Sequence, residues 1–283
     1  MKQTVIYLLC FLLLVFVHVG FLNGEIWTLR QEIRQTAAPS VVLPPPVLKM
    51  VALEHSGLLA NAHLLKLMTF YGGRYMNAQA LDESDWRYVE RLINSVIALD
   101  PKFADAYLMG EGLFLYDANN VDAAIRLMEK GRQNRPEDWR MTFYLGANYL
   151  LGKNDYRNAA KYFMESSEIP GSPSFLPTLA ARLGHYSGET KVSILFLKGL
   201  LEQTSDPVLK GKMQKRLSAL EGAMVLENAI REFKEREARD PDSMDELVRR
   251  GILENVPKDP YGGKWTLSPE GRVYSTSRFA EAE

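Results

Sequence analysis

Apolar residues recur at three- and four-residue steps along most of the chain between residues 48 and 220, which predicts a series of amphipathic helices. The pattern stops at Asp100-Pro101, and a new helical pattern begins at once. Proline cannot donate a backbone hydrogen bond to the preceding turn, so a proline here ends a helix. We predict that the helix before Pro101 begins with Asp85 as its N-cap and that an earlier apolar stretch from Leu48, one helix or two short ones, ends at Gly72-Gly73.

Similar breaks follow at regular intervals. Pro101, Pro136 and Pro170 are 35 and 34 residues apart, and Pro173 and Pro207 are again 34 residues apart. Each interval contains an apolar helical pattern, a short polar loop and a second apolar helical pattern. The repeating unit is therefore a helix–turn–helix. Because one such pair has too little core to fold alone, we expect neighbouring pairs to stack.

Small residues mark the first helix of each unit, where we expect the helix axes to approach most closely: Gly112, Gly146 and Gly184. The middle repeat has the pattern Leu145, Gly146, Tyr149, Ala159, Phe163 and Pro170, and the preceding repeat has Gly112, Ala124, Met128 and Pro136. With its period, this pattern resembles the tetratricopeptide repeat family over residues 48–220. The last repeat departs from it, since Pro177 crowds the helix start.

The resemblance implies an α-solenoid whose first helices line a concave groove for a protein or peptide partner. Aligning the three glycines gives the groove candidates Met109, Leu113, Tyr116, Arg140, Phe143, Ala147, Leu150 and His185. Apolar walls with one arginine suit an amphipathic helix or an extended peptide. Alternatively, the charged helix that begins at Val225 folds back and fills the groove.

The pattern changes in residues 221–283. A charged helix is predicted from Val225 to Arg239 and a short helix from Met244 to Arg250. Two short strand patterns, 264–267 and 272–276, flank a Pro-Glu-Gly turn and predict a β-hairpin. This is a small α+β module in an otherwise mostly α-helical chain.

This module resembles the C-terminal part of the type II secretion major pseudopilins. The matching positions are Met244, Leu247, Val248, Gly251, Leu253, Pro257, Asp259, Pro260 and Gly262. The resemblance implies a fold, and neither calcium binding nor filament assembly, because the acidic loop is not matched and a repeat array intervenes. A capping role at the end of the array is the alternative. We expect Asp259 to cap a turn rather than to act as an acid.

The first segment indicates location. Val5–Leu22 contains 18 residues with only His18 ionisable near neutral pH, and as a helix it spans about 27 Å, close to a bilayer core. Residues 1–35 are predicted to form a transmembrane helix and its extension, and Lys2 favours a single pass through the inner membrane with a periplasmic body. A cleaved signal peptide and a cytoplasmic body are the alternatives. The prolines of residues 36–47 predict an extended linker.

Composition restricts the classes of partner and of functional site that we expect. Lys and Arg (34) balance Asp and Glu (35) at a net charge of −1, which argues against nucleic acid as a partner. The single cysteine and the spacing of the four histidines give no metal-ligand pattern, so we expect no catalytic, metal or cofactor site. The expected function is a membrane-anchored scaffold, an adaptor in assembly of a bacterial envelope complex related to secretion or pili. The alternatives are a bracing or dimerising protein with a self-filled groove and, least favoured, an enzyme. Homo-oligomerisation stays open.

Overall fold

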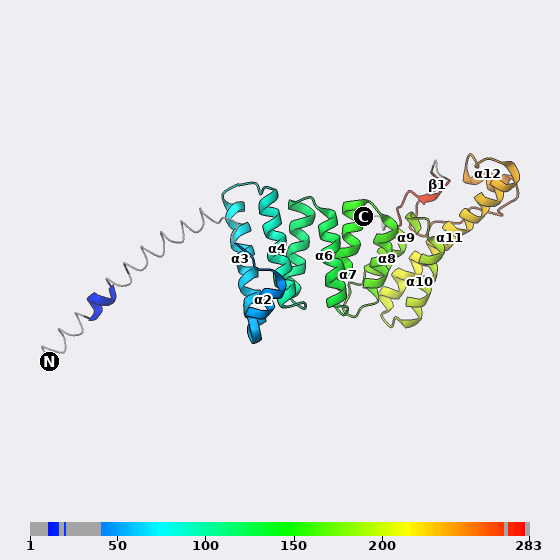
Figure 1. The fold of residues 1–283 in the computed structure, drawn as a ribbon. Helices are drawn as coiled ribbons and strands as arrows, with labels where there is room; N and C mark the ends of the chain where they lie inside the picture. The colour runs from blue at the N-terminus through cyan, green and yellow to red at the C-terminus, as the bar shows by residue number, and fades with distance from the viewer. Residues whose placement is uncertain (1–10, 17–19, 21–40, 269–270, 281–283) are drawn as a thin grey trace. The chain divides into compact units, whose positions relative to one another are not determined.

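The computed structural model describes residues 11–16, 20, 41–268 and 271–280. The chain divides into two compact units, one ending at Ala106 and one beginning at Tyr107. The described part is mostly helical, with helices that pack in sequence order, and it ends in a small antiparallel β-hairpin (Figure 1). No helix among the described residues is both long enough and apolar enough to cross a bilayer. Most of Val5–Leu22 lies outside the described residues.

The first unit contains α2 (Pro45–Ala52), the short 3₁₀ helix η1 (Leu53–His55), α3 (Ser56–Met76) and α4 (Glu83–Leu99). Helices α3 and α4 pack against each other, with the Phe70 ring edge-on to Tyr88 at 4.8 Å. The N-cap of α4 is Asp82, which accepts from the backbone N–H of Asp85, while the Asp85 carboxylate accepts from Asp82 N–H. Asp85 is thus the reciprocal partner in a capping box, and its prediction as the N-cap is wrong by three residues.

Two predicted helix boundaries in this unit also differ from the structure. The linker was expected to stay extended through residue 47, yet α2 begins at Pro45. The first turn of a helix tolerates proline, because its N–H groups have no partner within the helix. Helix α3 continues through Gly72-Gly73 to Met76. Glycine lowers helix stability by only about 1 kcal/mol per residue, which tertiary packing overcomes.

The second unit contains the repeats. The helices of the repeats are α5 (Ala104–Gly112, which crosses the boundary), α6 (Val121–Asn134), α7 (Trp139–Ala147), α8 (Tyr156–Ser167), α9 (Leu176–Tyr186) and α10 (Thr190–Gln203). From α6 to α10 each helix contacts the next, and α7, α8 and α9 stand side by side (Figure 1). The predicted order of helix, turn and helix is confirmed here. Pro177 lies in the first turn of α9 and does not disturb it.

A π-helical turn ends the first helix in two consecutive repeats, at η2 (Leu113–Asp117) and η3 (Asn148–Gly152). The backbone N–H of Ala118 donates to Leu113 O, five residues back, at 2.9 Å. A π turn accommodates one residue more than a regular α-helical turn. Each of these two helices therefore contains one extra residue in its last turn, and the loop that follows does not have to accommodate it.

The recurring glycines are not equivalent. A Cβ on Gly146 would lie 2.8 Å from the Phe163 ring, and one on Gly184 would overlap Ser193 Oγ. A Cβ on Gly112 would have nothing within 4 Å. Close approach is thus confirmed at Gly146 and Gly184 and wrong at Gly112. In that repeat the close contact falls at Gly131 of α6, where a Cβ would lie 2.8 Å from Met141 Sδ.

The C-terminal part begins with α11 (Pro207–Glu237), one helix of 31 residues. The sequence pattern predicted that the repeats end at residue 220 and that a separate charged helix begins at Val225. The intervening Gly222 stays helical, and a Cβ there would lie 3.3 Å from the Trp265 ring. After α12 (Met244–Arg249), β1 (Trp265–Leu267) pairs antiparallel with β2 (Val273–Ser275). The predicted order of helix, helix and hairpin is confirmed.

These glycine contacts predict different effects for two similar substitutions. We expect Gly146→Ala to lower the free energy of unfolding by about 1–3 kcal/mol, because the Phe163 ring must move. Gly112→Ala should leave it unchanged or raise it by up to about 1 kcal/mol, through helix propensity alone. Urea unfolding followed by circular dichroism measures both. Equal effects of the two substitutions would contradict the conclusion that Gly146 lies against another side chain and Gly112 does not.

Candidate functional site

The eight predicted groove residues differ widely in exposure. Tyr116 is 70% exposed, whereas Leu113 and His185 are buried. The other five side chains are half-buried: Met109, Arg140, Phe143, Ala147 and Leu150. Leu113 and His185 therefore do not line an open surface.

The half-buried apolar residues of α7 and of the following η3 pack between helices. The Phe143 ring lies 5.4 Å from that of Phe163 in α8. Ala147 and Leu150 pack against the same cluster, which includes residues of α9. These contacts hold α7, α8 and α9 together, and they leave the three side chains little surface for a partner.

Arg140, the one basic groove candidate, is paired within its own helix turn. Its Nη2 lies 2.7 Å from Asp138 Oδ2, and Arg135 Nη2 reaches the same oxygen at 3.0 Å. The hydrogen bonds from Arg140 lead those that lower the pKa of Asp138 to about 2. Asp138 is also the N-cap of α7, accepting from the backbone N–H of Arg140. The arginine thus stabilises the helix start.

His185 lies under the C-terminal segment. Its Nδ1 is 2.9 Å from Thr190 Oγ1, and the Thr190 hydroxyl donates to Glu227 Oε1 at 2.8 Å. The ring of Phe279 covers it at a centroid distance of 5.3 Å. Burial lowers the pKa of His185 to about 4, so the imidazole is neutral at pH 7.

Residues 271–280 form this cover. Phe279 is fully buried in a cluster with side chains of α9, α10 and α11, and Arg272 Nη1 donates to Tyr186 O at 3.0 Å. Arg278 and Phe279 have φ angles of 51° and 54°, uncommon for residues other than glycine. The chain itself therefore covers His185. The hairpin segment supplies Phe279, and α11, which contains the charged stretch from Val225 named as the alternative filling element, also reaches this place through Glu227 and Thr190.

Asp259 organises the turn before β1. Its carboxylate accepts from the hydroxyls of Ser275 at 2.5 Å and Ser277 at 2.6 Å, and from the backbone N–H groups of Tyr261 and Gly263. Burial opposes its ionisation, but these hydrogen bonds outweigh that effect and lower its pKa. The predicted structural role of Asp259 as a turn cap is confirmed.

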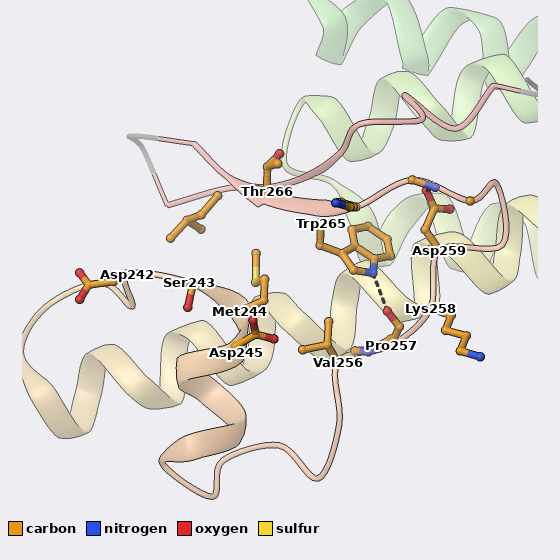
Figure 2. Close-up of a pocket in the computed structure, with 14 residues that line it drawn as sticks. Asp242, Ser243, Met244, Asp245, Val256, Pro257, Lys258, Asp259, Trp265 and Thr266 are labelled. Atoms are coloured by element: carbon orange, nitrogen blue, oxygen red, sulfur yellow. Dashed lines mark hydrogen bonds between the residues drawn. The ribbon is translucent and has the colours of Figure 1, made fainter.

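A cleft of about 720 Å³ opens beside this turn, between the start of α12 and β1 (Figure 2). Trp265 and Pro257 both line the cleft and are joined by a hydrogen bond, in which Trp265 Nε1 donates to Pro257 O at 2.7 Å. Met244, Val256 and Leu267 give the cleft an apolar lining, while Asp245, Lys258 and Lys264 add charge. No sequence pattern indicated this cleft, because the candidate positions came only from the first helices of the repeats.

Glu111 is a second feature that was not predicted from the sequence. It is buried in the π-ended first helix of a repeat and forms no ion pair with another described residue. Burial raises its pKa to about 7. The available signal was one carboxylate in the apolar stretch Leu108–Leu115. Within the described ranges, no group of three or more His, Cys, Asp or Glu side chains is arranged to hold a metal ion.

Comparison of the chain with protein-family models, with curated proteins and with solved structures finds no match.

The low pKa of His185 predicts a stability that falls in acid. Between pH 6.5 and about 4 the unfolded state binds a proton that the folded state does not, so stability is lost as pH falls through this range. The maximum loss from this residue is about 3 kcal/mol. Urea unfolding at pH 7.5 and at pH 5 measures this loss. Between these pH values the free energy of unfolding should fall less for His185→Gln than for the unmodified chain. Identical losses would rule out the assigned protonation state.

The raised pKa of Glu111 predicts the opposite dependence of stability on pH. Its carboxyl ionises readily in the unfolded state but only near pH 7 in the folded state, so stability is lost as pH rises from about 4.5 to 7. We expect Glu111→Gln to raise the free energy of unfolding at pH 8 by up to about 3 kcal/mol and to change little at pH 4. The exposed Glu168 offers a matched control. A similar gain from Glu168→Gln would contradict the explanation.

Proposed function

We propose that this chain is a membrane-anchored protein–protein interaction scaffold, an adaptor in assembly of a bacterial envelope complex. Residues 5–22 would cross the inner membrane once, and the tetratricopeptide-like repeats of residues 48–220 would form a solenoid on the periplasmic side. The described part of the first segment supports the anchor. Residues 11–16 are helical, and their six apolar side chains are 42–78% exposed, as a lipid-facing helix requires.

The observation that carries the proposal is the exposed apolar surface of α2, η1 and α3. Nine large apolar side chains are exposed there: Val47, Met50, Val51, Leu53, Leu58, Leu65, Met68, Tyr75 and Met76. Along α3, Leu58, Leu65 and Met68 share one face, whereas the buried Leu67 and Phe70 lie on the opposite face toward α4. An apolar surface of this extent is typical of a protein or membrane contact.

A second exposed pair supports partner binding by the repeats themselves. Tyr116 and Leu151 are 70% and 61% exposed, and they occupy corresponding places in the two π turns. Because π turns are frequent at functional sites, these positions are better contact candidates than the half-buried residues of α7.

One observation favours the second candidate function, a bracing or dimerising protein with a self-filled groove. The α9 end is covered by residues 271–280, which leaves no open groove at His185. On this alternative, the exposed side chains of α2 and α3 meet a second copy of the chain.

A photo-crosslinking amino acid placed at Leu65 or at Tyr116 in native membranes tests these proposals. Glu90, exposed on α4, is the control position. We expect a discrete adduct with another envelope protein from Leu65, and none from Glu90. Leu65→Glu combined with a crosslinker at Met68 should reduce the adduct about tenfold, since burying one leucine is worth 1.5–3 kcal/mol. An adduct only with a second copy would favour the dimerising alternative, and no adduct at any position would overturn both.

A further inference from the structure

In the part of the chain that the structure describes, one edge of β1 has no partner strand. Thr276 N–H donates to Lys264 O, and Ser268 N–H donates to Arg272 O, both at 2.9 Å. In an antiparallel ladder, hydrogen-bonded pairs alternate with pairs that are not hydrogen-bonded. These two bonds therefore identify every second residue of β1 as the one that bonds to β2.

It follows that the backbone groups of Trp265 and Leu267 point away from β2. Trp265 faces Ser275 and Leu267 faces Val273 as pairs that are not hydrogen-bonded. Within the described ranges, the N–H and C=O groups of Trp265 and Leu267 have no backbone partner. Such an edge is a template for another strand, and folded proteins usually cover it.

The cleft of about 720 Å³ lies along this edge. Residues 264–267 line it, and no residue of β2 does, which places it on the unpaired side of the hairpin. Residues 242–245 and 256–258 form the facing wall (Figure 2). The side chain of Met244, from the start of α12, gives this wall an apolar centre.

Charges on the cleft differ from one end to the other. Figure 2 shows Asp242 and Lys258 at opposite ends. Asp242 lies 3.6 Å from Arg239, whereas Asp245, Lys258 and Lys264 form no ion pair with another described residue. Asp259 also lines the cleft, but its carboxylate already accepts four hydrogen bonds within the chain. A ligand that complements the remaining charges carries a basic group toward Asp245 and an acidic group toward Lys258 or Lys264.

We infer that the cleft binds an extended peptide segment of a partner protein, which pairs with β1 as an added strand. Its backbone bonds to Trp265 and Leu267, its alternate apolar side chains contact Met244 and Val256, and an acidic residue faces Lys258 or Lys264. An extended peptide supplies all three features at once. The cleft contains no residue of α2 or α3, so the inference stands or falls independently of the proposed function.

The test uses the full chain in detergent as bait for a phage-displayed library of random heptapeptides, followed by synthetic copies of the selected peptides. Leu267→Pro is the informative variant, because it removes an edge N–H without removing a bond to β2. Leu267→Ala is its control, since it shortens the same side chain and keeps the N–H. We expect selected peptides to alternate apolar and polar residues, to carry an acidic end, and to bind Leu267→Pro about tenfold more weakly than Leu267→Ala.

A second pair of measurements keeps the test decisive if the proline variant misfolds. N-methylation of the peptide should abolish binding at every second position only, because strand pairing uses alternate N–H groups. Lys264→Glu should shift selection from acidic to basic ends. The inference is wrong if no peptide is enriched on the unmodified chain, or if peptides still bind when N-methylated at any position. It is also wrong if the chain forms a dimer that Leu267→Pro dissociates, because the occupant of the cleft would then be a second copy.

Discussion

Burial of each helix by the next is the interaction on which the second unit depends. A single helix pair exposes an apolar face on both sides, and only a neighbouring pair covers it. The contact of Gly146 with the Phe163 ring shows how close that cover is, since one added methyl group would displace the ring. Phe143, Ala147 and Leu150 fill the same layer. Residues that a tetratricopeptide-like alignment assigns to a groove are here used mainly to hold the stack together.

The same requirement explains the C-terminal segment. The helices α9, α10 and α11 pack together, and the described chain continues after α11 into α12 and the hairpin rather than into another helix pair of the repeat type. The segment 271–280 supplies the missing surface by inserting Phe279 among their side chains. Asp259, through its bonds to Ser275 and Ser277, fixes the turn that directs this segment back to α9. The C-terminal segment thus packs against these helices through Phe279, while the β1 edge and the adjoining cleft take no part in this contact.

Much of this fold was predictable from sequence, and the errors have identifiable physical causes. The proline spacing and the turn residues gave the helix pairs and the hairpin, because they act locally. The register of the first repeat was wrong, since Gly112 and Gly146 look alike in sequence but only Gly146 meets another side chain. The boundary expected between residue 220 and Val225 is absent, because Gly222 lies within the continuous helix α11 and leaves room for Trp265, more than 40 residues later. The cleft and the cover over His185 arise from contacts between distant residues, which no local pattern encodes.

The burial of Phe279 has a consequence for the order in which the chain folds during its synthesis. Helices α9 to α11 are complete by residue 237, but the ring that seals them emerges 42 residues later. Throughout that interval Ala181, Leu197 and Leu220 lack their final cover, so the nascent chain carries a temporary apolar surface. A chaperone, or rapid elongation through this stretch, would protect the nascent chain at the stage when it is most prone to aggregate with other chains.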